Sequence, residues 1–141
     1  MASRKEHDEL GAVFGIGAAL LKAALADQIK TPADFLAVGL GGLVGGVGGS
    51  RAPDVLEPAT HPGHRSTMHS AVVTSALVLK GGEFVIETSN EMITDQHTDP
   101  VDRFGRLFLS SMMVAAPVGY ASHILADAGT PAGIPLLTKG F

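Results

Sequence analysis

The feature of this sequence that most restricts its fold is a glycine-rich apolar segment, FLAVGLGGLVGGVGG, at residues 35–49. Gly41, Gly45 and Gly49 recur at every fourth residue, and two further glycines lie beside them. In a helix this spacing places the glycines along one face, where a neighbouring helix can approach closely. Each interior glycine costs about 1 kcal/mol relative to alanine, so tertiary packing or lipid must stabilise such a helix. We predict a closely packed helix here, with a flexible glycine-rich loop as the alternative.

The composition of the chain limits both its size class and its chemistry. A length of 141 residues is usual for one domain, and we assign residues 1–141 to a single domain. Cysteine is absent, which excludes disulfides, thiolate ligands and a cysteine nucleophile, so any metal must be held by nitrogen and oxygen. The formal net charge of -4 and the lack of a basic patch argue against nucleic acid as a partner.

Two further apolar segments have a clear helical pattern. Residues 10–29 are rich in alanine and leucine and predict a helix that ends before Pro32, where the glycine-rich helix begins. Residues 106–127 predict a helix that Pro117 kinks and Gly129 ends. The chain therefore has at least two candidate helices beside the glycine-rich one.

The region between residues 66 and 100 is less regular. Residues 69–80 predict a helix that starts near residues 66–67 and ends at the glycine pair 81–82, although the β-branched side chains also permit a strand. The stretch EFVIETSN that follows alternates enough to be a short strand or hairpin arm. The predicted fold is all-α: a small helical bundle with a short polar strand or hairpin excursion around residues 82–100.

Half of the six histidines lie in the stretch HPGHRSTMHS, residues 61–70. His64 and His69 are five residues apart, which would point them away from each other on one regular helix. If a Pro-Gly turn precedes a helix that starts near Ser66, His64 lies in the approach and His69 in the first turn, and both can face one site. The alternative is a solvated loop.

A second candidate pair lies in the last apolar segment. His123 and Asp127 are four residues apart, so on a helix their side chains leave the same face one turn from each other. Their neighbours in sequence are apolar, and burying two polar side chains in such surroundings is costly unless they are paired or bind a metal. A hydrogen bond at the helix surface is the alternative interpretation.

Carboxylates and one more histidine complete the candidate donors. Asp54 and Glu57 lie in the proline-bounded stretch RAPDVLEPATH, where the alternative roles are an N-cap and a surface charge, and His7 lies near the start of the first helix. Four separate places thus supply histidine or carboxylate, as in helical bundles whose metal ligands face inward. These donors suit Zn, Mn or Fe.

Several stretches resemble one known family. GHRSTMHS at residues 63–70 resembles the signature GHRGxTHS, and GYASHILADAGTPAGIPLL at residues 119–137 resembles GYLSHxLxDxxTPxGxPLL. Both signatures belong to the YdjM-like family of LexA-binding, inner-membrane-associated metal-dependent hydrolases. PDVLEP at residues 53–58 is similar to that family's LPDxDHP, and EHDELGAVFG at residues 6–15 to its opening histidine and small apolar helix. The resemblance covers most of the chain in the same order.

The resemblance implies a small helical protein at the inner membrane that binds a divalent metal, Zn with Mn or Fe as alternatives. By position it implies these metal ligands: His7, Asp54, His64, His69, His123 and Asp127. The chain departs from the family in two places. Leu56 and Glu57 stand where the family often has a second aspartate, which argues against a second metal ion. Ser66, Thr67 and Met68 stand where the family has Gly-x-Thr before the second histidine.

The predicted function is that of a hydrolase that uses a metal-activated water on a small-molecule or anionic substrate, for example a phosphoester. Asp54 and Arg65 are the candidate catalytic residues: Asp54 as ligand or bridge, and Arg65 as a bidentate contact to an anionic group, with a surface arginine as the alternative. The alternative function is a non-catalytic component of an assembly, in which a metal only staples the fold.

The apolar segments also predict a location. Residues 35–49 carry no charge, and together with the first and last apolar segments they favour association with the inner membrane. Lys22 and Asp27 would then have to face a protein interior or a wet cavity. The short spans leave the alternative of a cytoplasmic protein, a homo-oligomer that hides the glycines between subunits, or a part of a larger assembly.

Overall fold

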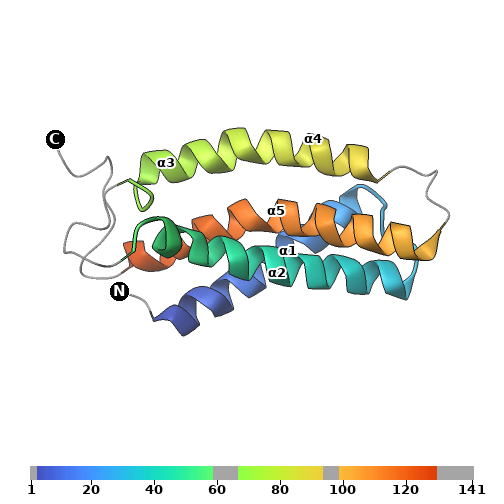
Figure 1. The fold of residues 1–141 in the computed structure, drawn as a ribbon, viewed down its shortest axis with the longest axis horizontal. Helices are drawn as coiled ribbons and strands as arrows, with labels where there is room; N and C mark the ends of the chain where they lie inside the picture. Colours follow the sequence, from blue (N-terminus) through green and yellow to red (C-terminus); the bar gives the residue numbers. More distant parts are fainter. Residues whose placement is uncertain (1–2, 59–66, 94–98, 130–141) are drawn as a thin grey trace.

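The computed structural model describes residues 3–58, 67–93 and 99–129, and within these ranges the chain is all-α, as predicted (Figure 1). The elements are, in order, α1 (Arg4–Leu25), α2 (Pro32–Leu56), α3 (Ala71–Ala76), the π-helical segment η1 (Leu77–Gly81), α4 (Gly82–Met92) and α5 (Pro100–Ala128). Helices α1, α2 and α5 pack against one another and are called the three-helix core below. The continuous run of α3, η1 and α4 is called the arm; among the described helices of the core it contacts only α5.

Polar caps set the beginnings of the long helices. Ser3 and Glu6 form a capping box that starts α1 six residues earlier than the apolar pattern predicts. Thr31 caps α2 together with Asp34, and Pro32 takes its first position, as predicted. Asp99 caps α5, which therefore starts before residue 106. Hydrophobic periodicity marks the packed part of each helix, whereas these caps extend the helices beyond it.

Glycines let α2 lie between α1 and α5 at backbone contact, so the predicted helix is confirmed and the loop alternative is wrong. A Cβ built on Gly45 would overlap the carbonyl of Met112 in α5, and one built on Gly46 would overlap the carbonyl of Gly11 in α1. Helix α1 meets this surface with small residues of its own at a spacing of four, Gly11, Gly15 and Ala19. The glycines therefore serve two neighbours, one on each side of α2.

The arm corrects the prediction for residues 82–100. The stretch EFVIETSN is helical within α4 rather than a strand or hairpin arm, and residues 94–98 lie outside the described residues. Gly81 and Gly82 have helical backbone angles and do not end the helix. Ser70 caps α3, so the helix starts a few residues later than predicted. The less exposed positions Val85 and Ser89 are four residues apart, which is the period of a helix lying on α5.

Large apolar side chains lie mostly on the outside of the bundle. Phe14, Phe35, Leu40 and Leu109 are all exposed, while the interior of the core is built from alanine, glycine and serine with few large side chains. Helices α2 and α5 are both long and apolar enough to cross a membrane, each with a mean hydropathy of 1.3 in its most apolar window. This distribution suits helices that meet each other through small residues and meet lipid through large ones.

The antiparallel order of the helices brings four chain segments to one end of the bundle (Figure 1). These are the start of α1, the end of α2, the approach to α3 and the end of α5. Helix α5 ends at Gly129, as predicted. The candidate donors lie in these segments.

Candidate metal centre

Five of the six predicted metal ligands come together at this end of the bundle: His7 from α1, Asp54 from α2, His69 from the residues before α3, and His123 and Asp127 from α5. The sixth, His64, and the predicted anion contact Arg65 lie outside the described residues, as does His61. Pairing His123 with Asp127 at one helical turn was sufficient to find the buried α5 pair. We refer to the five residues as the His/Asp cluster.

Contacts at Nδ1 orient the rings of two of the histidines. His123 donates its Nδ1–H to the backbone carbonyl of Ser50 at 2.6 Å, and because a carbonyl only accepts, this bond assigns the proton to Nδ1. His69 has its Nδ1 3.3 Å from a carboxylate oxygen of Glu57 and its Nε2 3.3 Å from one of Asp54, so either ring nitrogen can carry its proton. When both rings carry their proton on Nδ1, each Nε2 presents a lone pair. Metal-binding histidines are oriented by such contacts.

These two Nε2 atoms face each other at 3.3 Å. In the tautomer with both protons on Nδ1, two lone pairs at that distance repel, and a shared cation removes the repulsion. For a tetrahedral ion with bonds of about 2.0–2.1 Å to nitrogen, neighbouring donors are separated by about 3.3–3.4 Å. The observed separation of the two nitrogens is that of two donors on one such ion.

Carboxylates surround the same point. Asp54 Oδ1 lies 3.3 Å from His69 Nε2 and 3.6 Å from His123 Nε2. Asp127 Oδ2 lies 3.6 Å from His123 Nε2, and its Oδ1 lies 3.7 Å from His7 Nε2. Two overlapping groups have donor atoms that all lie within 4.8 Å of one another: His7 with Asp54 and His123, and His69 with His123 and Asp127. The donor atoms that converge here are nitrogen and oxygen, as expected for a chain without cysteine.

The cluster is buried except at Asp54. His7, His69, His123 and Asp127 are all buried, whereas the side chain of Asp54 is 40% exposed. The rings of His7 and His123 stack with their centroids 3.8 Å apart, and within the described part of the chain His7 Nδ1 has no hydrogen-bond partner. Burying so many polar groups is costly without a compensating charge, and the single exposed ligand marks the side from which the cluster can be reached.

Glu57 holds the approach to α3 against the end of α2. Its two carboxylate oxygens accept hydrogen bonds from the backbone N–H groups of Thr67 and Met68, both at 2.8 Å, and one of them also lies against His69. Tyr120 donates to the carbonyl of Met68 from α5. Glu57 is therefore a positioning residue rather than an exposed surface charge. Glu57 was a candidate donor from the sequence, but its contacts with the segment before α3 were not predicted.

A pocket of about 370 Å³ opens beside the exposed edge of the cluster. The residues that line it are Arg4, His7, Asp8, Ser50, Arg51, Asp54 and Val55. Arg51 makes a two-pronged contact with Asp8, with both N···O distances at 2.7 Å, and this contact holds the pKa of Asp8 below its usual value. Two arginines thus lie next to two of the ligands.

Sequence reasoning missed both of these arginines. Arg4 precedes His7 by three residues and Arg51 precedes Asp54 by three, so each arginine shares a helix face with a ligand. That spacing was the available signal, but it identifies a pocket only once α1 and α2 are known to pack side by side.

Comparison with known protein families gives one match. The family model described as YdjM inner membrane protein matches residues 3–138, which is nearly the whole chain. Comparison with curated proteins and with solved structures gave no match. The match covers every segment that contributes to the His/Asp cluster.

Proposed function

The chain belongs to the YdjM inner membrane protein family and is associated with the inner membrane, and on this premise we propose that it is a metal-dependent hydrolase. The His/Asp cluster holds the metal in this proposal, with His64 as a further ligand. The cluster lies at one end of helices whose outer faces are apolar, so the chemistry takes place at an end of the bundle rather than along its lipid-facing sides.

The facing Nε2 atoms of His69 and His123 carry the proposal. Each ring is held from behind through Nδ1, so neither can turn its other nitrogen inward without losing that bond. A proton shared between the rings would also relieve the repulsion, and the two aspartates at the same point would stabilise either cation, so the metal analysis below distinguishes the two. Neutral imidazoles with carboxylates favour Zn, and Mn or Fe fit the same donors.

A divalent ion in such a site lowers the pKa of a bound water and polarises the bond to be cut. The buried histidines keep bulk water away from the inner side of the cluster. Asp54 borders the pocket, and its carboxylate is placed to accept a proton from a water that enters there. With this arrangement the reaction needs no protein nucleophile.

The pocket favours an anionic substrate, and we propose a phosphoester. The guanidinium of Arg51 has the planar fork that binds carboxylate or phosphate in a two-pronged contact, and in the structure Asp8 occupies it. Arg4 adds a second positive charge on the same wall. Arg65, adjacent to His64 in sequence, is proposed as a third contact to the anion.

Metal analysis with an activity screen tests the proposal. Protein purified without a metal-affinity tag should contain about one ion per chain, and His123→Ala should lose it. With Zn, Mn or Fe added back, the protein should hydrolyse p-nitrophenyl phosphate or its diester. A metal content well below one ion per chain that His123→Ala leaves unchanged would contradict the proposal.

A second pair of variants tests the substrate pocket separately from the metal. Arg51→Lys keeps the charge but loses the two-pronged contact, so KM for the phosphoester should rise about tenfold at unchanged metal content. Arg106→Lys is the matched control, because Arg106 pairs with Asp102 at the opposite end of the bundle. Equal KM values for the two variants would remove Arg51 from substrate binding.

A structural metal is the alternative, and the burial of four ligands at the junction of α1, α2, α5 and the approach to α3 favours it. Structural sites fill every coordination position with protein, whereas catalytic sites keep one open. If Asp54→Asn abolishes hydrolysis without lowering the melting temperature, the metal is catalytic. If no phosphoester, ester or amide is cleaved and removal of the metal unfolds the chain, the metal is structural.

A further inference from the structure

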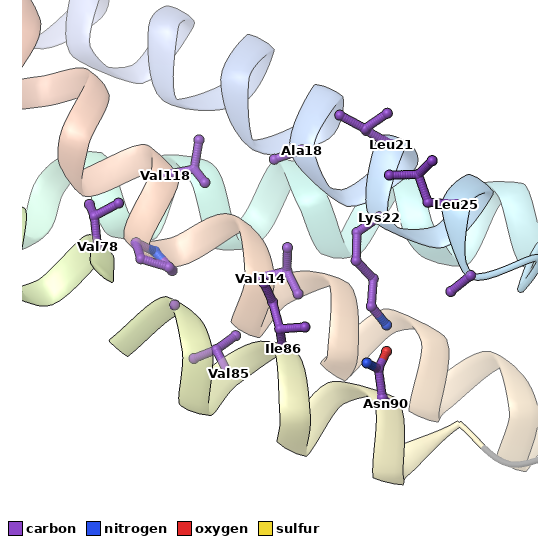
Figure 2. Close-up of a pocket in the computed structure, with 13 residues that line it drawn as sticks. Ala18, Leu21, Lys22, Leu25, Val78, Val85, Ile86, Asn90, Val114 and Val118 are labelled. Atoms are coloured by element: carbon purple, nitrogen blue, oxygen red, sulfur yellow. The ribbon is translucent and has the colours of Figure 1, made fainter. Parts of the chain in front are cut away.

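A second, chemically different cavity lies between the core and the arm. It has a volume of about 560 Å³, within the roughly 300–1,000 Å³ of small-molecule sites. Val114 and Val118 of α5 form its floor, with Leu21 of α1 on one wall and Val85 of α4 on the other (Figure 2). Helices α1 and α4 do not contact each other in the described chain, so this groove separates them over its whole length.

The groove is apolar along its length and polar at one end. Figure 2 shows Val78 and Val118 at one end, and Lys22 from α1 and Asn90 from α4 directed toward each other at the other. Val78 and Asn90 are 12 residues apart, which corresponds to about 18 Å along a helix. An occupant that matches this lining is long, apolar and polar at one tip.

The polar end carries a positive charge that the described residues do not neutralise. Lys22 is half-buried and donates one hydrogen bond, to Gln28 Oε1 at 3.0 Å, and within the described ranges no carboxylate lies at ion-pair distance from it. An ammonium group has three donors, so Lys22 has donors left for an anion. The amide of Asn90 can donate to the same anion.

The apolar side chains along the walls of the groove are exposed on the outside of the bundle. Leu21, Leu25 and Ile86 border the groove and are all exposed. In a protein of the inner membrane such side chains meet lipid, so an alkyl chain can enter the groove sideways without crossing water. Lys22 then lies where long cationic side chains reach the headgroup region.

We propose that this groove binds one long-chain fatty acid, with its carboxylate on Lys22 and Asn90 and its alkyl chain along Val85, Val114 and Val118. A single carboxylate matches one ammonium and one amide, and an apolar volume of about 560 Å³ matches a single alkyl chain. The polar end lies at the opposite end of the bundle from the His/Asp cluster (Figure 1). The fatty acid is therefore a ligand of a separate site, and the proposal does not depend on the hydrolase chemistry.

Binding of the fluorescent fatty acid cis-parinaric acid to the full chain in dodecyl maltoside micelles tests this proposal. Palmitate should displace the probe, and monopalmitoylglycerol, which has the same chain but no charge, should displace it at least tenfold less well. Lys22→Gln should weaken palmitate binding about tenfold and leave the weak glyceride binding unchanged. Equal displacement by palmitate and the glyceride would overturn the proposal.

Two neighbouring glycines supply a matched pair that tests the position of the site. Gly82 lines the groove and Gly81 does not, and a Cβ at either position meets nothing within 4 Å. Gly82→Leu should abolish probe binding by filling the groove, whereas Gly81→Leu should bind as the unsubstituted protein does. Undiminished binding by Gly82→Leu, with circular dichroism showing both variants folded, would place the fatty acid elsewhere and refute the proposal.

Discussion

In the three-helix core five of the seven glycines of α2 lie against neighbouring backbones, whereas the two glycines in the middle of the arm face open space. A Cβ on Gly45 would strike a carbonyl of α5, but a Cβ on Gly81 or Gly82 would meet no atom within 4 Å. The same residue therefore sets the distance between helices in one region and adds only backbone freedom in the other. Glycine spacing distinguishes the two regions: a repeat of four in α2, an isolated pair in the arm.

The largest effect should come from closing the contact between α2 and α5. Gly45→Leu must push the backbones apart, and we expect it to lower the free energy of unfolding by about 3 kcal/mol or more. Thermal unfolding in detergent micelles, followed by circular dichroism, measures the loss. Gly48→Leu is the control, because a Cβ at Gly48 meets nothing within 4 Å. Equal melting temperatures for the two variants would contradict backbone contact along α2.

Removing the metal should loosen the arm more than the core. His69 ties the start of the arm to Asp54 and His123, and an ion present at a hundred times its Kd stabilises the folded chain by about 2.7 kcal/mol. After chelation, hydrogen exchange should accelerate in residues 71–92 while α2 stays protected. The same chelator should change nothing in His123→Ala. Unchanged exchange of the arm in the unsubstituted protein would show that no ion holds it.

Glu57→Gln should have an intermediate effect that is confined to the approach to α3. The amide keeps one acceptor oxygen for the N–H groups of Thr67 and Met68 and loses the other with the charge, at a cost of about 1–3 kcal/mol. Chemical unfolding should show this loss. Glu9→Gln, at an exposed position, should change stability by less than about 0.5 kcal/mol. A loss no larger than that of Glu9→Gln would mean that Glu57 does not hold the loop.

The smallest effect should be a gain. Gly81→Ala adds a methyl group in open space within a helix and should stabilise the chain by about 0.5–1 kcal/mol. Gly46→Ala makes the same chemical change where the methyl group would strike α1, and it should destabilise the chain. Melting temperatures that shift in the same direction for both variants would contradict the difference between core and arm.

The parts of the structure that sequence predicted correctly are those set by local spacing. The fourfold glycine repeat of α2, its start at Pro32 and the pairing of His123 with Asp127 all depend on residues within one or two helical turns of each other. Burial then follows because the flanking residues are apolar. The five described members of the cluster could be named because they lie at the ends of such segments and match the motifs of the family by position.

The parts that sequence did not predict depend on neighbours far along the chain or on the solvent. The alternation in EFVIETSN comes largely from Phe84 and Ile86, which are exposed on the outside of α4 rather than buried on one face of a strand. A rule that expects apolar side chains inside fails where the outside meets lipid. Arg51 beside Asp8 and Glu57 beneath Thr67 became visible only with the packing of α1 on α2 and the path of the chain before α3.

The His/Asp cluster draws on both the first and the last described helix, and this has a consequence for biosynthesis. More than a hundred residues are translated between His7 and the pair His123 and Asp127. A nascent chain therefore cannot bring the five side chains together until α5 has been translated and inserted beside α1 and α2. Maturation of the site must then follow assembly of the core, and a chain interrupted before α5 would reach the membrane without it.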